Sequence, residues 1–153
     1  MSENQSVALV LGAGNSTGAA IAERFARGGY TVCLVRRNGE ALAPLVERIQ
    51  ESAGTARGYG CDVRDEDQVD GLVEHIEAEL GPIEVAVFNA GVNLWTSILE
   101  ESADRYRGLW ETNAFGGFLA GRAVARVLAE RGRGSIFFTG ATASLRGGAN
   151  FAA

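Results

Sequence analysis

The chain has 153 residues, of which 46% are hydrophobic and 22% are charged, and its formal net charge is -5 at pH 7. This length suits one domain over residues 1–153, and the composition excludes an intrinsically disordered chain. The negative charge argues against a nucleic-acid surface, and no apolar run is long enough to cross a bilayer. Residues 1–5 are short and polar, unlike a secretory signal, so we expect a cytoplasmic protein that binds neither nucleic acid nor membrane.

Along the chain, short apolar runs alternate with segments of helical periodicity. The first run is continuously apolar, as in a strand that is buried on both faces, and glycines close most of the helical segments. The predicted strands span residues 7–11, 31–35, 56–61, 84–88 and 135–139. The predicted helices contain the apolar patterns at 21–26, 41–49, 69–80 and 101–131.

This alternation predicts an α/β fold, because successive parallel strands are joined by right-handed helical crossovers. We expect a Rossmann-like doubly wound sheet with strand order 3-2-1-4-5, in three layers. Ligand should then bind outside the carboxyl ends of strands 1 and 4, where the strand order reverses. The fifth strand should form an apolar, unpaired edge.

A glycine-containing turn joins the first strand to the first helix. Backbone N–H groups at such a turn and at the helix start can face a pyrophosphate. The candidate cofactor-binding residues here are Gly12, Gly14, Asn15, Ser16, Thr17 and Gly18. An ordinary glycine-rich turn is the alternative, because Thr17 occupies the place of the final glycine in the strict dinucleotide fingerprint.

Two arginines, Arg36 and Arg37, end the second strand. A nucleotide fold that binds NAD usually has an acid at this place, which repels a 2′-phosphate. Arginine suits the multi-donor recognition of phosphate, so the pair predicts NADP(H) as the cofactor. The alternative is that both side chains are simply solvated.

These motifs, in this order, resemble the short-chain dehydrogenase/reductase family. Its loop has the form Thr-Gly-x-x-x-Gly-x-Gly, and Gly12 and Gly18 match the first and last glycines. Leu11 replaces the threonine, and Ser16 replaces the middle glycine. The resemblance implies that the loop holds a nicotinamide dinucleotide.

Three further matches extend the resemblance over most of the chain. Asp62 and Val63 resemble an Asp-Val step whose side chain and backbone N–H meet the adenine, although Asp62 alone reads as a helix cap. The segment Asn89, Ala90 and Gly91 resembles an Asn-Asn-Ala-Gly turn that lets the backbone approach the cofactor. Asn113 resembles an asparagine that distorts its helix and organises a water at the active site; a lone asparagine there would simply be solvated.

The resemblance also implies a reaction, in which hydride moves between the nicotinamide and a small carbonyl or alcohol substrate. The family uses a Tyr-x-x-x-Lys pair and a serine, but all 14 basic residues of this chain are arginines. Gly140 and Ala141 occupy the expected serine position. Ser144 is the substitute catalytic candidate beside Asn113, unless this hydroxyl and its neighbours Thr139 and Thr142 only satisfy loop backbone groups.

We therefore expect a C-terminally truncated form of an NADP-dependent oxidoreductase whose full-length form is a homo-oligomer. The alternatives are a non-catalytic NADP(H)-binding module or sensor, and a nucleotide fold that binds nothing. No metal site is expected, because His75 is the only histidine and the two cysteines, Cys33 and Cys61, should be reduced and buried.

Overall fold

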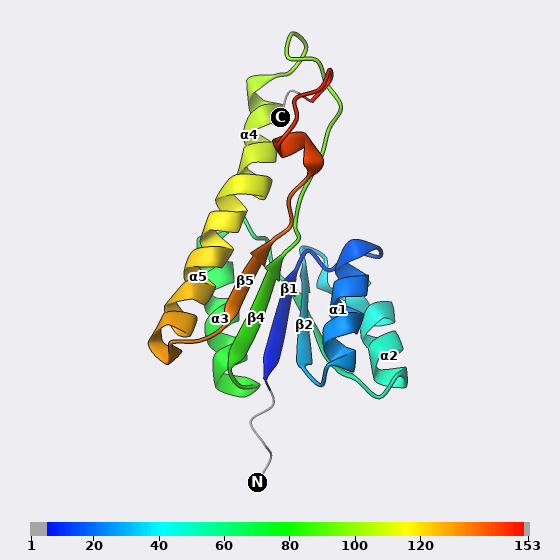
Figure 1. Cartoon of the computed structure of the whole chain (residues 1–153), viewed down its shortest axis with the longest axis vertical. Coiled ribbons are helices and arrows are strands. Elements are labelled where there is room, and N and C mark those ends of the chain that lie inside the picture. Colours follow the sequence, from blue (N-terminus) through cyan, green and yellow to red (C-terminus); the bar gives the residue numbers. More distant parts are fainter. Residues whose placement is uncertain (1–5, 152–153) are drawn as a thin grey trace.

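The computed structural model describes residues 6–151, whose centre is one five-stranded sheet. All neighbouring strands are parallel, and their order is β3-β2-β1-β4-β5 (Figure 1). The predicted topology is confirmed, and each predicted strand lies within one residue of its observed bounds. The strands are β1 (Val7–Leu11), β2 (Thr31–Arg36), β3 (Thr55–Gly60), β4 (Ile83–Phe88) and β5 (Ser135–Phe138).

The helices follow the predicted alternation, with one difference. The helix predicted over residues 101–131 is a single helical run that a π-helical turn, η2 (Glu111–Phe115), divides into α4 (Ala103–Trp110) and α5 (Gly116–Arg131). The apolar pattern has a helical period on both sides of such a turn, so this pattern could not reveal the π-helical turn. The other helices are α1 (Thr17–Arg27), α2 (Ala43–Glu51), α3 (Glu66–Glu79) and the short 3-10 turns η1 (Gly39–Leu42) and η3 (Thr142–Ser144).

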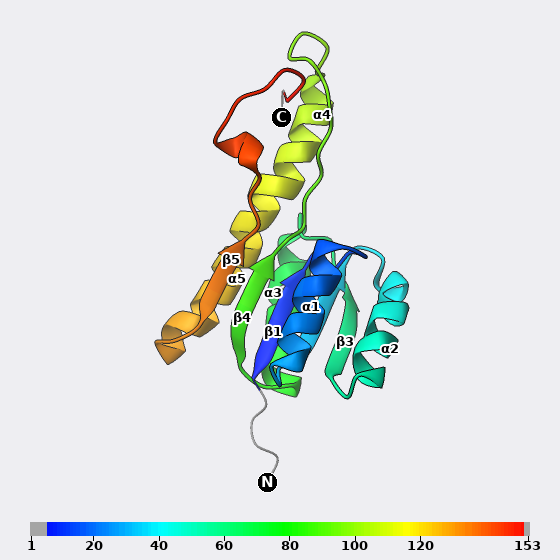
Figure 2. The ribbon, with the colours of Figure 1, turned by 45° about the vertical axis from the view of Figure 1, so that its right-hand side comes forward.

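Strand β1 shows why the fold has three layers. All five of its residues are buried, and their side chains alternate between two faces. Leu9 packs into the core beneath α3 and α5, whereas Val10 packs into the core beneath α1 and α2. The turned view shows α1 in front of the sheet and α3 and α5 behind it (Figure 2).

The start of α3 and one ion pair illustrate how the sequence sets these elements. Asp65 caps α3, because its side chain accepts a hydrogen bond from the backbone N–H of Gln68. Arg122 on α5 then reaches Glu66 on α3 at 2.6 Å, which ties together the two helices on this face. This packing fixes where the segment after β3 enters α3.

A second region projects beyond the sheet. It consists of the loop after β4, helix α4 and the tail after β5, and it rises above the carboxyl ends of the strands (Figure 1). Among the described residues, the loop and the tail meet at a bridge between Thr96 and Phe151, beside which Trp95 and Phe151 pack with ring centroids 4.5 Å apart. Across residues 6–151, no helix combines the length and apolarity that a membrane span needs.

Candidate nucleotide-binding site

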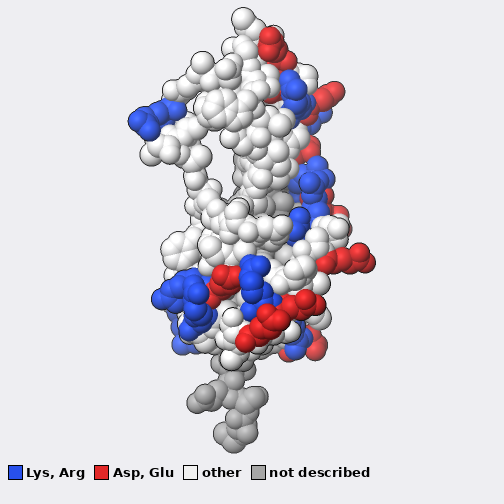
Figure 3. All heavy atoms as spheres, turned by 90° about the vertical axis from the view of Figure 1, so that its right-hand side faces the viewer, with Lys and Arg blue, Asp and Glu red and all other residues white. Residues whose placement is uncertain are grey.

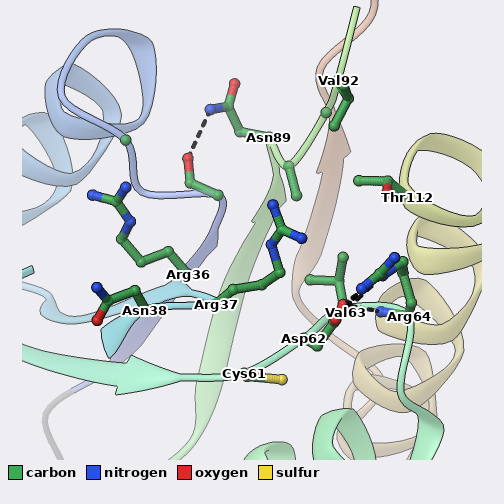
Figure 4. A pocket seen from close by; sticks show the side chains of 14 residues that line it. Arg36, Arg37, Asn38, Cys61, Asp62, Val63, Arg64, Asn89, Val92 and Thr112 are labelled. Atoms are coloured by element: carbon green, nitrogen blue, oxygen red, sulfur yellow. Dashed lines mark hydrogen bonds and ion pairs between the residues drawn. The ribbon is translucent and has the colours of Figure 1, made fainter. Parts of the chain in front are cut away.

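A cavity of about 740 Å³ opens at the carboxyl ends of β1, β2, β3 and β4. This is the place where the strand order reverses and where ligands bind in open α/β sheets. Its walls come from the loops after these four strands and from η2, and Figure 4 shows their side chains converging on one space. The lining residues are Gly12, Gly14, Arg36, Arg37, Asn38, Cys61, Asp62, Val63, Arg64, Asn89, Ala90, Gly91, Val92 and Thr112.

Two glycines of the first loop allow the backbone to pack tightly. Gly12 has a φ of +90°, and a Cβ there would collide with the backbone of Ala90 after β4. A Cβ on Gly18 would collide with the carbonyl oxygen of Gly12. Both positions therefore require glycine, and the loop is more constrained than an ordinary glycine-rich turn.

The rest of the loop leaves space at the start of α1. A Cβ on Gly14 would meet nothing within 4 Å, and Asn15, Ser16 and Thr17 are exposed. Ser16 precedes the helix but makes no side-chain capping hydrogen bond, and the first turn of α1 carries no acid. Ala19 already donates its N–H to the carbonyl oxygen of Gly14, so an anion would be attracted by the N–H groups that precede Ala19 and by the positive end of the helix dipole. Of the predicted loop residues, Gly12 and Gly14 line the cavity itself.

The two arginines predicted to select the cofactor both line the cavity. Arg36 is the last residue of β2, and Figure 4 shows its side chain extending toward the loop between β1 and α1. Arg37 points into the middle of the space below Asn89 (Figure 4). The guanidiniums are therefore turned toward the crevice and not away from it.

Asp62 and Val63 follow β3 and form the next part of the wall. Asp62 is not the cap of α3; its carboxylate instead holds Arg64, with a shortest contact of 2.6 Å between Oδ2 and Nη2. The hydrogen bonds from Arg64 lower the pKa of the Asp62 carboxyl. Sequence patterns gave no sign that Arg64 belongs to the site, because a charged residue before a helix usually lies in solvent.

The segment after β4 is joined directly to the first loop. Asn89 donates a hydrogen bond from Nδ2 to the carbonyl oxygen of Gly12 at 3.0 Å, and its backbone N–H donates to Leu11. Ala90 and Gly91, like Asn89, line the cavity. The predicted residues of the first and fourth loops are thereby brought together on opposite sides of the switch point.

Asn113 lies at the centre of the π-helical turn, so its helix is distorted as the resemblance implied. Its side chain bonds twice to the backbone of Val92: Oδ1 accepts from the N–H and Nδ2 donates to the carbonyl, each at 2.8 Å. Asn113 thus fixes the loop that leaves the cavity, although it does not line the cavity. Its neighbour Thr112 does line it, which the sequence did not indicate.

Ser144 lies outside this cavity. It is exposed, and its hydroxyl donates to the carbonyl oxygen of Ala141 at 2.6 Å. The structure therefore places it in the backbone-satisfying arrangement that the sequence left open, and a catalytic part for Ser144 stays a prediction.

The two cysteines are free and buried, as predicted. Burial raises the pKa of Cys33 to about 12 and that of Cys61 to about 11, so both thiols are protonated and unreactive near neutral pH. Within residues 6–151, no three His, Cys, Asp or Glu side chains come together as metal ligands would. His75 is exposed on α3 and meets Tyr59 edge to face.

Comparison with known proteins places this site in a family. The family model described as short chain dehydrogenase matches residues 6–153. The chain is 35% identical over 130 residues to D-threitol dehydrogenase of Mycolicibacterium smegmatis, covering 85% of this chain and 50% of that protein. It is 31% identical over 138 residues to 2,3-dihydro-2,3-dihydroxybenzoate dehydrogenase of Bacillus subtilis, covering 90% of this chain and 53% of that protein.

Solved structures agree with this assignment. A short-chain dehydrogenase from Rhodopseudomonas palustris matches with a TM-score of 0.92 and 45% identity, over 98% of this chain and 70% of that one. An actinorhodin polyketide ketoreductase variant with NADPH matches with a TM-score of 0.93 and 30% identity, over 99% and 59% of the two chains. NAD⁺-bound xylitol dehydrogenase matches with a TM-score of 0.92 and 31% identity, over 98% and 58%.

The chain spans about half the length of the curated relatives that it matches. The match to the family model nevertheless runs through all five strands, and the predicted motifs lie on the loops that build the cavity. This chain belongs to the short-chain dehydrogenase family of oxidoreductases.

Proposed function

We propose that this chain binds NADP(H) in the cavity at the carboxyl end of its sheet. The observation that carries the proposal is the position of Arg36 and Arg37, which line the cavity together with Gly12 and Gly14. Phosphate recognition needs N–H donors and positive charge at one place, and here the free start of α1 supplies the first and the arginines supply the second.

The phosphorylated cofactor is favoured over NAD(H) by charge. The relatives differ in this respect, since one matching structure is described with NADPH and another with NAD⁺. In this chain no acid stands at the end of β2, and two guanidiniums occupy that place. An adenosine ribose that carried a 2′-phosphate there would gain charge-assisted hydrogen bonds, which an unphosphorylated ribose cannot make.

The residues present fit such a cofactor. Gly12 and Gly18 bring the loop backbone close to the sheet, and the open side of Gly14 leaves room in the cavity. Asn89 holds the loop in place through its bond to the carbonyl oxygen of Gly12. When bound, the nicotinamide would supply or accept the hydride that family members exchange with a small carbonyl or alcohol carbon.

For the longer protein we propose that oxidoreduction of a small carbonyl or alcohol is the activity. Asn113 is the positioning candidate in this chain, because it fixes Val92 at the cavity rim. Ser144 is proposed as a substrate-side hydroxyl only if it leaves its bond to Ala141. The predicted homo-oligomer and cytoplasmic location stay predictions.

A non-catalytic NADP(H)-binding module is the second candidate. The residues that line the cavity can hold the nucleotide whether or not a reaction follows, and none of the three tyrosines of the described chain is among them. Incubation with NADPH and a panel of carbonyl compounds separates the two: the module predicts binding without NADPH consumption, and the enzyme predicts turnover.

Titration calorimetry with NADPH and NADH tests the cofactor assignment. We expect wild type to prefer NADPH and the Arg36→Asp or Arg37→Asp variant to lose about tenfold or more of that preference, since a charged hydrogen bond to phosphate is lost and repulsion is added. Arg146→Asp is the matched control, because it makes the same charge change on the exposed tail. An unchanged NADPH to NADH ratio in both cavity variants would contradict the proposal.

A further inference from the structure

The wall of the cavity after β3 contains a carboxylate whose acceptor sites are mostly used. Oδ1 of Asp62 accepts from the backbone N–H of Arg64 at 3.1 Å, and Oδ2 accepts from Nη2 at 2.6 Å. The single N–H of Nε is shared between the two oxygens, at 3.0 Å from Oδ1 and 3.2 Å from Oδ2. A carboxylate offers about four lone-pair sites, so the three N–H groups of Arg64 occupy most of them.

This wall lies where the base of a bound nucleotide would come. Helix α1 begins after β1, and the two arginines proposed to bind phosphate lie at the end of β2. Asp62 follows β3, which is the next strand outward in the sheet. Neighbouring strands are about 4.8 Å apart, so a nucleotide held by its phosphates at β1 and β2 extends its base over the end of β3. Figure 4 shows Asp62, Val63 and Arg64 together at that side of the space.

We propose that Arg64 determines base selectivity at this site by masking the Asp62 carboxylate. The inference rests on the proposed binding of NADP(H). With Arg64 in place, the wall presents guanidinium N–H groups that are not engaged by Asp62, and these suit an acceptor on the base. Without Arg64, the wall presents a bare carboxylate, which attracts an amino group and repels a carbonyl oxygen.

A bound ligand can displace Arg64 from Asp62 at little cost. The side chains of Arg64 and Asp62 are 38% and 26% exposed, and ion pairs at such surfaces contribute little net stability. A base with an amino group can therefore displace the guanidinium, but it loses part of its own hydrogen-bond gain in doing so. The native site should thus discriminate only weakly between an adenine, which carries an amino donor, and a hypoxanthine, which carries a carbonyl acceptor at the same position.

The test compares binding of NADPH with binding of its hypoxanthine analogue, which differs only at that one position of the base. We expect the preference for the adenine form to rise about fivefold in Arg64→Ala, as one charge-assisted hydrogen bond in a partly exposed site becomes available. Loss of the positive charge of Arg64 weakens both nucleotides through their shared phosphates, so the ratio of the two dissociation constants isolates the base. Arg64→Gln removes the charge with a longer side chain and should change the ratio in the same direction.

Arg48→Ala is the matched control. Arg48 on α2 makes a partly exposed pair of the same kind, with Nε 2.6 Å from Glu23 Oε1 on α1, and it lies outside the cavity. The ratio should not change in this variant, and circular dichroism melting checks that each variant is folded.

The possible results distinguish a failure of masking by Arg64 from a failure of the proposed NADP(H) binding. If NADPH binds and Arg64→Ala leaves the ratio unchanged, or lowers it, masking by Arg64 is wrong while the NADP(H) site stands. If Arg48→Ala raises the ratio as much, the effect is not local and the inference is overturned. If neither nucleotide binds wild type, the proposed function falls, and the inference falls with it.

Discussion

The sheet region and the projecting region differ in how deeply their apolar side chains are buried. In the sheet region, the cores on the two faces of the sheet close over β1, whose five residues are all buried. In the projecting region, large apolar side chains are exposed, including Leu99, Trp95 and Leu145. The cavity lies on the sheet region, except for residues 89–92 of the loop after β4 and Thr112 of η2.

The same contrast appears in the charges. On the face drawn in Figure 3, acidic and basic side chains mix over the lower part of the molecule and along the right-hand edge of the upper part, whereas the rest of the upper surface is largely uncharged. The sheet region therefore carries the complete set of phosphate-binding candidates on a packed scaffold. Nucleotide binding can therefore be tested on the packed part of the chain, whereas the projecting region presents exposed apolar side chains.

The largest effect is expected where the two loops of the cavity touch. Gly12→Ala should destabilise the fold by about 4 kcal/mol, because the residue has a φ of +90° and its new Cβ would strike the backbone of Ala90. Urea unfolding followed by circular dichroism measures this. Gly71→Ala is the control, since nothing lies within 4 Å of its Cβ on α3, and it should stabilise by about 0.5–1 kcal/mol. Equal effects of the two substitutions would show that the loop contact is not tight.

A matched pair of leucines sharpens the comparison between the regions. Leu9 on β1 is 0% exposed and Leu145 in the tail is 87% exposed. Leu9→Ala should cost about 3 kcal/mol, because it removes buried apolar area and leaves a cavity. Leu145→Ala should change the free energy of unfolding by less than about 0.5 kcal/mol. A loss of several kcal/mol at Leu145 would mean that the tail is packed as firmly as the sheet.

The smallest effect concerns the pH dependence of stability. Arg64 lowers the pKa of Asp62, so the ionised carboxylate stabilises the fold above the unfolded pKa of about 3.9, and this contribution is lost as the pH falls through the folded pKa. The difference in stability between wild type and Asp62→Asn should be constant above about pH 5 and shrink in acid. A difference that grows as the pH falls would have the wrong sign for this ion pair.

The parts of the fold that follow from periodicity could be predicted from the sequence. The buried run of β1, the cap at Asp65 and the strand order are examples, because each depends on local pattern or on the general handedness of crossovers. The π-helical turn at Asn113 follows instead from its two bonds to Val92, which lies 21 positions away. Periodicity within the helix cannot register a contact of that kind.

The site, like the fold, has parts that could be predicted from the sequence and parts that could not. Glycines and arginines at the ends of strands indicated the cavity, since the carboxyl ends of parallel strands meet at one edge. The partner of Asp62 could not be foreseen, because an Asp before a helix is normally a cap and Arg64 reads as a solvated charge. Ser144 was the catalytic candidate because it follows β5 in the sequence. In the structure it lies in the projecting region, where its hydroxyl donates to the carbonyl oxygen of Ala141.

Amide chemical shifts of the isotope-labelled chain during titration with NADPH test the central claim most directly. We expect saturable shifts at Gly12 to Gly18, at Arg36 and Arg37, and at Asp62 to Arg64, with NADH producing smaller changes at the two arginines. Shifts confined to α4 and the tail, or no saturable shift at all, would contradict a nucleotide site at the carboxyl end of this sheet.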